Sequence, residues 1–413
     1  MRSRWSAIPL LALALACGKN PVEPAPTRIT ALPRALTSGE QRLIDADNRL
    51  AIKLLKQVTT ETSDTLPNLF ISPLSIAMAL GMTYNGAAGT TEAAMRATLE
   101  LDSMTLAEVN EANRSLIKLL RELDSHVKFQ LANSIWYDPQ FQVEPPFLDA
   151  TRTYFDARVE SIDFRSPGAS QTINDWVKQQ TQGLIPTIVP SPIPDGVLMY
   201  LINAIYFKGD WTQQFDKTLT QPRPFHLADG TSITVPTMAH EHPAKIRSAR
   251  TSSAIVVDLP YGGQAFSMTI VLPQQPATVD ELVAGLTLDQ WREWTENLDS
   301  LGAQLYLPKF KLENNLSLNA TLRTLGMEVA FTEFADFSRM SPTQGVQITD
   351  VLHRTFVRVD EEGTEAAAAT AVGVGTTCVC GPEPIFVDRP FVFALRENLS
   401  GTILFLGVVR DPR

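Results

Sequence analysis

Cysteine is nearly absent from this 413-residue chain, which contains only three. Two of them, Cys378 and Cys380, are separated by one residue, and the third is Cys17, so no disulfide framework is available to hold a core. Two thiolates without a nearby His or Cys make a poor zinc site. We interpret Cys378 and Cys380 as free thiols, with a mutual disulfide or a redox- or metal-sensitive role as the alternatives.

Basic residues are also scarce relative to acidic ones. The chain has 35 Lys and Arg against 45 Asp and Glu, a formal net charge of −10. Nucleic acids and anionic lipids are bound by basic stripes, and the sequence has none, which excludes them as main partners. With 44% hydrophobic and 19% charged residues, the composition is that of an ordinary globular protein.

Common catalytic motifs are missing as well. The sequence has no Gly-x-Ser-x-Gly elbow, no Gly-x-x-x-x-Gly-Lys-Ser/Thr loop and no His-Glu-x-x-His helix. His240 and His242 would share one face only in a strand and lack a third metal ligand nearby. Gly373 and Gly375 lack the third glycine of a dinucleotide-binding turn. Although the five histidines leave a hydrolase open, nothing organises one, and we expect no enzyme, metal or cofactor.

The N-terminus has the pattern of an export signal. Arg2 and Arg4 precede an apolar run that ends in small residues before Cys17. This arrangement resembles a bacterial lipoprotein box, in which the thiol of Cys17 is acylated. Ordinary signal cleavage after residues 14–16 is the alternative.

Residues 1–17 are therefore interpreted as a signal peptide, and the Pro-rich residues 18–37 as a linker to the folded body. We expect an exported protein: an outer-membrane or cell-surface lipoprotein, or a secreted, extracellular protein. A membrane contact is expected only through the N-terminal lipid, because no later apolar run is long enough to span a bilayer.

Helix patterns come early in the remaining sequence, and strand patterns come late. Residues 38–41 resemble a capping box that opens a helix to about residue 58, and a helix apolar nearly all round follows Ser72 and Pro73. Gly262 and Gly263 join two apolar runs as a hairpin. Strands are predicted at 69–71, 199–211, 254–261, 266–273, 391–397 and 402–409. We expect one α+β domain, residues 38–413, with mixed or antiparallel sheets.

One stretch near the C-terminus, residues 360–384, has many small residues and joins two apolar runs. Alternate positions from Thr364 carry Ala366, Ala368 and Thr370 on one face, while Glu365, the sole charge between residues 364 and 377, lies on the other. These residues suit a strand, an Ala-rich helix or exposed coil. The stretch is interpreted as bait for a protease that can afterwards enter a sheet, with a flexible surface loop as the alternative.

Several separate stretches, this one among them, resemble the serpins, the serine protease inhibitor superfamily. They follow one another in the family's order: 68–76, 201–211, 307–310, 335–338, 351–353, 361–370 and 388–393. The resemblance implies an α+β fold with three β-sheets surrounded by eight or nine helices. It also implies an exposed reactive-centre loop, here at about residues 361–384.

The resemblance further implies an inhibitor of serine, or alternatively cysteine, endopeptidases that acts as a suicide substrate. The protease would cut the loop, form a covalent acyl-enzyme and be distorted as the freed loop inserts into the central sheet. The inhibitor would be a monomer. The alternatives are a non-inhibitory serpin that acts as a binding protein or a plain substrate, and a redox-responsive surface protein.

The resemblance assigns roles to individual residues. The hinge of the loop would comprise Glu361, Gly363, Thr364, Ala366, Ala368 and Thr370. A polar cluster called the shutter, which keeps the central sheet closed, would comprise Ser72, Ser75, Asn203 and His353. An ion pair beside a tryptophan, called the breach, would comprise Trp211, Lys309 and Glu361.

The same resemblance gives two positions for the reactive bond. Counting from Glu361 puts it at Thr377-Cys378, whereas counting back from Arg389 points nearer Val379. No Lys or Arg lies between residues 366 and 384, which argues against trypsin-like proteases and favours elastase-like ones. The basic helix that binds polyanions in some serpins is not expected, because its candidates lie among acidic residues: Arg114, Lys118 and Arg121.

Overall fold

The computed structural model describes residues 27–240, 246–299, 303–364 and 383–413. Some of the predicted sites lie outside the described residues: the signal peptide 1–17 with Cys17, the hinge residues Ala366, Ala368 and Thr370, and the reactive bond Thr377-Cys378.

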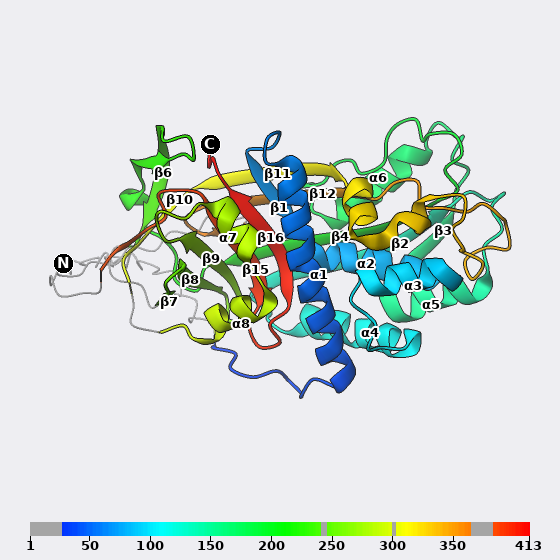
Figure 1. The fold of residues 1–413 in the computed structure, drawn as a ribbon, viewed down its shortest axis with the longest axis horizontal. Coiled ribbons are helices and arrows are strands. Elements are labelled where there is room, and N and C mark those ends of the chain that lie inside the picture. Colours follow the sequence, from blue (N-terminus) through cyan, green and yellow to red (C-terminus); the bar gives the residue numbers. More distant parts are fainter. Residues whose placement is uncertain (1–26, 241–245, 300–302, 365–382) are drawn as a thin grey trace, which may run out of the picture.

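Nine α-helices lie in the described part of the chain (Figure 1). They are α1 (Ser38–Thr62), α2 (Pro73–Tyr84), α3 (Gly89–Thr98), α4 (Leu106–Glu122), α5 (Pro145–Phe155), α6 (Ala169–Gln180), α7 (Val279–Gly285), α8 (Leu288–Glu296) and α9 (Asn319–Leu322). Three short helical turns add η1 (Lys217–Leu219), η2 (Arg323–Met327) and η3 (Glu328–Phe331).

The strands form three sheets, which we call the core, small and central sheets. The core sheet has the order β1 (Asn68–Ile71), β16 (Ile403–Val409), β15 (Phe391–Glu397), β9 (Phe266–Pro273), β8 (Ala254–Tyr261) and β7 (Arg247–Arg250). The small sheet has the order β14 (Ile385–Phe386), β10 (Leu305–Pro308), β6 (Ser232–Ala239) and β5 (Gln221–His226). The central sheet has the order β11 (Phe310–Ser317), β12 (Leu352–Val359), β13 (Gly363–Thr364), β4 (Met199–Asp210), β2 (Val127–Tyr137) and β3 (Ala157–Ser161).

This architecture confirms the expected α+β fold with three sheets and eight or nine helices. The pairs β2–β3 and β10–β14 are parallel, and the other strand pairs are antiparallel. The hairpin predicted around Gly262 and Gly263 forms between β8 and β9 as expected.

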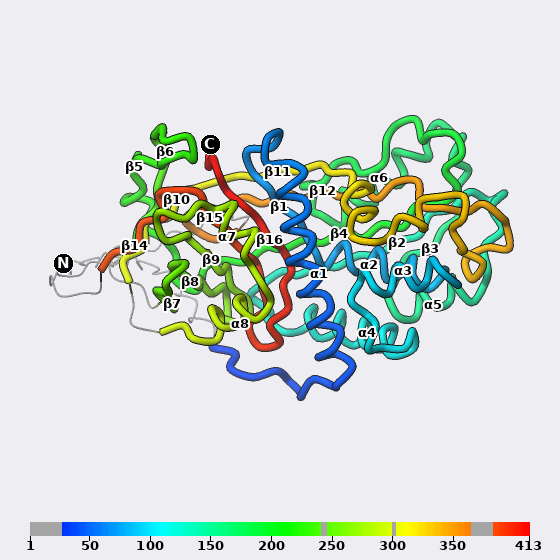
Figure 2. The backbone as a smooth tube through the Cα atoms, in the orientation of Figure 1, coloured from blue at the N-terminus to red at the C-terminus, as the bar shows by residue number. Residues whose placement is uncertain are grey.

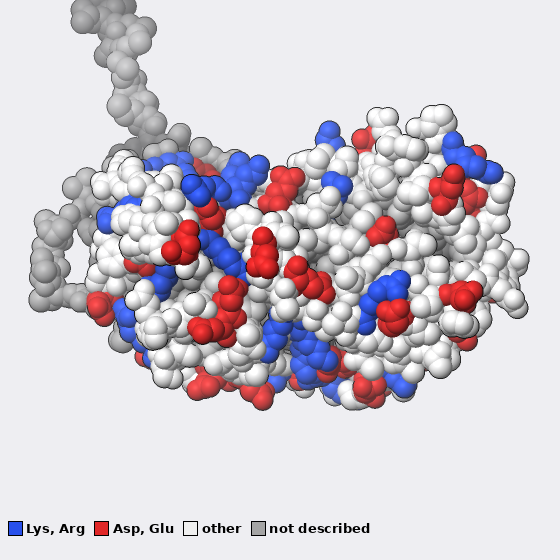
Figure 3. Space-filling view, turned by 45° about the horizontal axis from the view of Figure 1, so that its top comes forward, with Lys and Arg blue, Asp and Glu red and all other residues white. Residues whose placement is uncertain are grey.

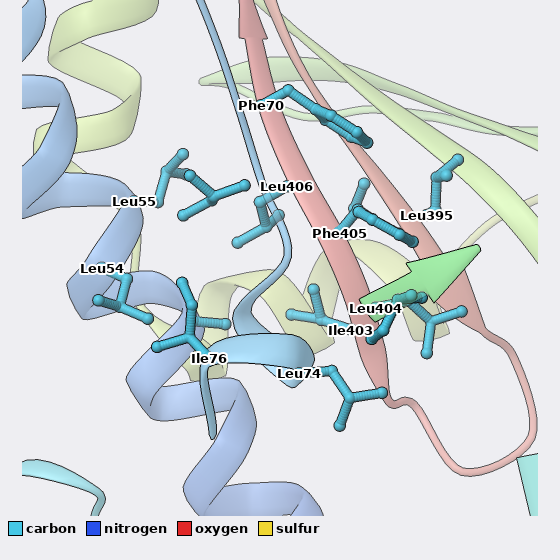
Figure 4. Packing of buried hydrophobic residues seen from close by; sticks show 14 of the residues in the cluster. Leu54, Leu55, Phe70, Leu74, Ile76, Leu395, Ile403, Leu404, Phe405 and Leu406 are labelled. Carbon is cyan, nitrogen blue, oxygen red and sulfur yellow. The ribbon is translucent and has the colours of Figure 1, made fainter. Parts of the chain in front are cut away.

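The main hydrophobic core lies between α1, α2 and the core sheet. Figure 4 shows Leu54 and Leu55 of α1 beside Leu406 of β16, with Phe70 of β1 and Phe405 further into the core. The ring of Phe70 stacks on that of Phe405, with 5.1 Å between centroids. Helix α2 is buried almost all round, as its apolar sequence predicts, so it holds the core sheet and the central sheet together.

The start of α1 differs by one residue from the predicted capping box. Thr37, not Ser38, is the N-cap: its Oγ1 accepts from the Glu40 amide at 3.1 Å, and Glu40 Oε2 accepts from the Thr37 amide at 2.7 Å. Burial would raise the pKa of Glu40, but hydrogen bonds from Arg34 and Thr37 lower it to about 2. Glu40 takes the N3 position of the capping box in place of the predicted Gln41, because only a carboxylate can also form an ion pair with Arg34.

Residues 27–37, the described part of the predicted linker, pack against the body (Figure 2). The side chains of Ile29, Leu32 and Leu36 are partly buried on the core, and the Ile29 amide donates to the Gly263 carbonyl at 2.8 Å. Arg34 donates to Glu40 and to Ser115 of α4. This segment therefore ties α1, α4 and the β8–β9 hairpin together.

The Arg34–Glu40 contact allows a matched stability test. Replacing Arg34 with Met leaves the buried Glu40 carboxylate without its cation, and we expect a loss of about 1–3 kcal/mol. Arg42 forms a similar pair with the capping-box carboxylate Glu108, but both of those side chains are exposed, so Arg42→Met should change stability far less. Urea unfolding midpoints of the two variants would measure the difference, and equal midpoints would contradict the expectation.

Charged side chains are distributed rather than grouped on the surface. On the face shown in Figure 3, acidic and basic residues lie interspersed. Within the described ranges, no helix combines the length and hydrophobicity needed to cross a membrane.

Candidate functional site

The central sheet has an opening between β12 and β4. The two-residue strand β13 lies between them at one end, with Thr364 opposite Val359 of β12 and opposite Gly209 of β4. Among the described residues, β13 is the only strand that bridges β12 and β4. The opening therefore has the width of one further strand, and the first two residues of that strand are already in place.

The two residues of β13 are fixed by close packing. A side chain at Gly363 would lie 2.1 Å from the Gly209 carbonyl oxygen, so only glycine fits there. Thr364 is 2% exposed, and its hydroxyl bonds to the hydroxyl of Tyr261 on β8. The Tyr261 ring in turn stacks on Trp211 with 4.4 Å between centroids.

The three predicted breach residues meet directly above the opening. Lys309 Nζ lies 2.8 Å from Glu361 Oε2, and Trp211 Nε1 donates to the Asp360 carbonyl at 2.9 Å. Burial would raise the pKa of Glu361, but hydrogen bonds from Lys309 and Thr220 hold it below its usual value. The turn between β12 and β13 is thus held in place by an ion pair and an indole.

The four predicted shutter residues also come together, lower in the opening. The Ser72 amide donates to His353 Nε2 at 3.0 Å, and the Ser72 hydroxyl donates to the Leu404 carbonyl at 2.9 Å. The Ser75 hydroxyl donates to the Asn203 carbonyl at 3.4 Å. The cluster links the N-terminus of α2 to β12, β4 and the core sheet.

Sequence reasoning missed one member of this cluster, Asn133 of β2. Its Oδ1 accepts from Asn203 Nδ2 at 2.7 Å, and its Nδ2 donates to the Phe155 carbonyl at 2.6 Å. Asn133 lies directly opposite Asn203 in the ladder, and both side chains are buried. A polar residue in the midst of an apolar strand pattern was the available signal. Tyr261 and Lys217, which pairs with Glu362, were also missed.

Acidification should weaken the shutter through His353. Burial lowers the pKa of this imidazole to about 4, so it stays neutral in the folded protein, while the unfolded chain titrates near 6.5. As the pH falls, the unfolded chain therefore binds a proton at this imidazole before the folded protein does. The stabilisation of the fold by neutral His353 is complete above pH 6.5 and is lost as the pH falls toward 4. When the pH falls from 7 to 5, the free energy of unfolding of the wild type should decrease by about 2 kcal/mol more than that of His353→Gln. Denaturant unfolding of both proteins from pH 7 to 5 would measure it; parallel curves would contradict it.

The other candidate residues that the structure describes form no site of their own. No group of three or more His, Cys, Asp or Glu side chains in the described ranges could hold a metal ion. His240 stacks on Phe215 with 4.0 Å between centroids, and His242 lies outside the described residues. On α4, Arg114 pairs with Glu111 at 2.6 Å and Arg121 with Asp156 at 2.6 Å.

Comparisons with known proteins identify the same family throughout. A family model described as Serpin (serine protease inhibitor) matches residues 45–412. The chain is 36% identical to the leukocyte elastase inhibitor of Sus scrofa over 382 residues, which cover 90% of this chain and 100% of that protein. The leukocyte elastase inhibitor of Homo sapiens is 37% identical over 383 residues, with 90% and 100% covered.

Solved structures agree with these relatives. The thermophilic serpin tengpin in its native state has a TM-score of 0.82 and 30% sequence identity, with 94% of this chain and 97% of that chain covered. Human thyroxine-binding globulin in complex with its hormone has a TM-score of 0.81 and 27% identity, with 91% and 100% covered. The chain therefore belongs to the serpin family of serine protease inhibitors.

Proposed function

We propose that this serpin inhibits serine endopeptidases as a suicide substrate whose cleaved loop enters the central sheet. The observation that carries the proposal is the strand-wide opening between β12 and β4, in which β13 already occupies the first position. In this role the protein is an inhibitor and performs no catalysis itself.

Strand register supports the proposal. Thr364 lies opposite Gly209 and Val359. If the same antiparallel register continued, residue 370 would come to lie between Asn203 and His353. The shutter would then meet the hydroxyl of Thr370. Asn203 Oδ1 is buried and has no hydrogen-bond partner, so this acceptor could take the threonine hydroxyl.

Side-chain parity gives further support. The buried Thr364 faces inward, and residues two apart in a strand share a face. Ala366, Ala368 and Thr370 would therefore also face inward after insertion. Their small uncharged side chains would avoid the cost of burying an unpaired charge, which is several kcal/mol.

The chemistry begins at the reactive bond, which we place at Thr377-Cys378. The protease serine attacks the Thr377 carbonyl, the peptide bond to Cys378 breaks, and the Cys378 amine leaves with a proton. Insertion of the 13 residues from 365 to 377 would carry the acylated protease roughly 43 Å along the sheet. Distortion of its active site would then stop water from completing hydrolysis.

Elastase-like proteases are the proposed targets. Residues 366–384 contain no Lys or Arg, and two relatives are named leukocyte elastase inhibitor. Cysteine endopeptidases that accept small residues are the second target class, and a bond one or two residues later, near Val379, is the alternative cleavage site.

Export is proposed on the N-terminal pattern alone. A signal peptide over residues 1–17, with acylation of Cys17, would place the inhibitor at an outer membrane or cell surface, and ordinary cleavage would release it. Metabolic labelling with a fatty acid, compared between wild type and Cys17→Ser, would separate the two routes.

The function is tested by mixing residues 27–413, with and without reductant, with elastase-, chymotrypsin- and trypsin-type proteases. We expect a covalent 1:1 complex that survives boiling in detergent with the elastase type, and a released fragment that begins at Cys378 by mass spectrometry. Clean cleavage with return of active protease would favour a non-inhibitory binding protein or substrate. Inhibition that appears only under reductant would favour a redox-responsive protein.

A further inference from the structure

The small sheet carries a stack of three flat side chains on one of its faces. The ring of Phe386 on β14 lies against that of Tyr306 on β10, with 4.5 Å between centroids and 5° between planes. The guanidinium carbon of Arg223 on β5 lies 4.3 Å from the centroid of the same tyrosine ring. Since β14 and β5 are the two edges of this sheet, the stack runs across its whole width.

Strand alternation turns this stack toward solvent. Successive side chains of a strand point to opposite faces, and the neighbours Leu305, Leu307 and Ile385 are buried in the main core. Tyr306 and Phe386 therefore face outward, and Phe386 is 40% exposed. A single exposed ring needs no explanation, but aromatic rings beside an arginine are the composition of the centres of protein interfaces.

Arg223 has no acidic partner among the residues that the structure describes. Its guanidinium contacts the face of Tyr306, and its Nε is buried without a hydrogen-bond partner. Three other cations at this end of the molecule do form ion pairs with carboxylates of the chain: Lys217, Lys309 and Arg250. An arginine that is oriented by a ring and lacks a carboxylate of its own can bind a carboxylate from another molecule.

We propose that this stack is a docking surface for the target protease, and that it binds a protease surface loop with an Asp or Glu beside an apolar side chain. The carboxylate accepts hydrogen bonds from the terminal N–H groups of Arg223, and the apolar side chain packs on the exposed ring of Phe386. The inference rests on the proposed function, because the occupant is the protease that cuts the reactive loop.

Chain length places a bound protease within reach of the stack. Figure 2 shows β5, β6, β10 and β14 together at one end of the molecule. Phe386 follows Thr377 by nine positions, so the proposed reactive bond lies at most about 32 Å from Phe386. An endopeptidase domain of about 230 residues has a radius of gyration of about 17 Å, which corresponds to a diameter of about 45 Å. A protease that grips the bond is therefore large enough to contact the small sheet.

The docking contact acts only before the reactive bond is cut. The acylated protease stays attached to Thr377, whereas β14 lies on the other side of the broken bond. Insertion of the loop then carries the protease away from the stack. The contact therefore raises the rate of association and leaves unchanged the partition of the acyl-enzyme between trapping and hydrolysis.

The test measures the second-order rate constant of association with the elastase-type protease that forms the covalent complex fastest. Arg223→Gln should lower this constant about tenfold at low salt, and Phe386→Ala should lower it at least about threefold. Arg114→Gln on α4 is the control for charge, since it changes the net charge equally and lies away from the small sheet (Figure 1). Phe334→Ala is the control for an exposed ring, since Phe334 is 77% exposed beside α3. Both controls should associate as the wild type does.

Two further measurements identify the occupant and the step. The number of inhibitor molecules consumed per protease inactivated should stay constant in both stack variants, and added salt should narrow the difference between Arg223→Gln and the wild type, because salt screens the ion pair. Association rates equal to those of the controls would overturn the proposal. So would a dimer in light scattering that is lost in Phe386→Ala, because the occupant would then be a second copy of the chain. Arg223→Gln keeps both rings and decides the question even if Phe386→Ala folds poorly.

The rate of loop cleavage separates this inference from the proposed function. The kcat/KM with which the protease cuts the loop depends on docking, whether or not the protease is trapped afterwards. If cleavage slows in Arg223→Gln and no protease forms a covalent complex with the wild type, the proposed function fails and the docking surface stands. If complexes form at the same rate in the wild type and in both stack variants, the docking surface fails and the function stands.

Discussion

Substitution of Thr364 by arginine is expected to reduce the yield of covalent complex by at least about 100-fold. Thr364 is buried between β12 and β4 and bonds to Tyr261, so the new cation would have to leave β13 or be buried unpaired. A burial cost of about 3 kcal/mol or more would slow insertion by roughly two orders of magnitude, while hydrolysis of the acyl-enzyme continues.

The measurement is a denaturing gel together with an assay of protease activity. Thr364→Arg should still be cleaved at the reactive bond, but the protease should return to full activity. Glu383→Arg is the matched control, since its side chain is 79% exposed at the C-terminal end of the loop, beyond the proposed reactive bond, and it should trap protease as the wild type does. A boiling-resistant complex with Thr364→Arg at the wild-type yield would refute loop insertion through β13.

The largest loss of stability is expected for Asp258→Ala. Asp258 is fully buried in β8, where Arg396 Nη2 lies 3.1 Å from its Oδ1 and Ser267 and Thr269 donate to the same oxygen. Burial would raise the pKa of Asp258, but Arg396 and Arg247 hold it below its usual value. Its removal leaves the buried Arg396 charge uncompensated, which costs about 3–5 kcal/mol.

A double variant separates the lost pair from a general packing defect. If the unpaired cation causes the damage, Asp258→Ala combined with Arg396→Met should be more stable than Asp258→Ala alone. The lifetime of a kinetically trapped fold is set by its unfolding rate, so the unfolding rate at fixed temperature is measured here beside the denaturant midpoint. Equal unfolding rates for the single and double variants would show that the charge of Arg396 is not the source of the loss.

Much of the fold and of the site geometry could be predicted from the sequence where the signal was local. Gly262 and Gly263 between two apolar runs predicted the β8–β9 hairpin, and Ser72 with Pro73 predicted the start of α2. The grouping of His353 with Asn203 came from resemblance to a family, since no local pattern relates residues 150 positions apart in the sequence.

The features that were missed depend on contacts between distant segments. Whether Gly363 and Thr364 are coil or strand is decided by Gly209 and Tyr261, which no pattern around residue 363 contains. The Pro-rich composition of residues 18–37 suggested a linker, but within residues 27–37 three spaced apolar side chains and Arg34 find partners on the body. Composition describes the unfolded chain well and says little about such docking.

The two residues of β13 also bear on how fast the loop could move. Adding a strand to a sheet resembles helix formation. The first pairing must close a turn, which loses conformational entropy and gains few hydrogen bonds, whereas each later pairing extends an existing ladder. Here the turn from Val359 to Thr364 is already closed, so the nucleation step is complete before any protease arrives. Insertion after cleavage would then consist of propagation alone and would begin without a lag. Insertion must be fast in this way, because it has to finish before a water molecule hydrolyses the acyl-enzyme.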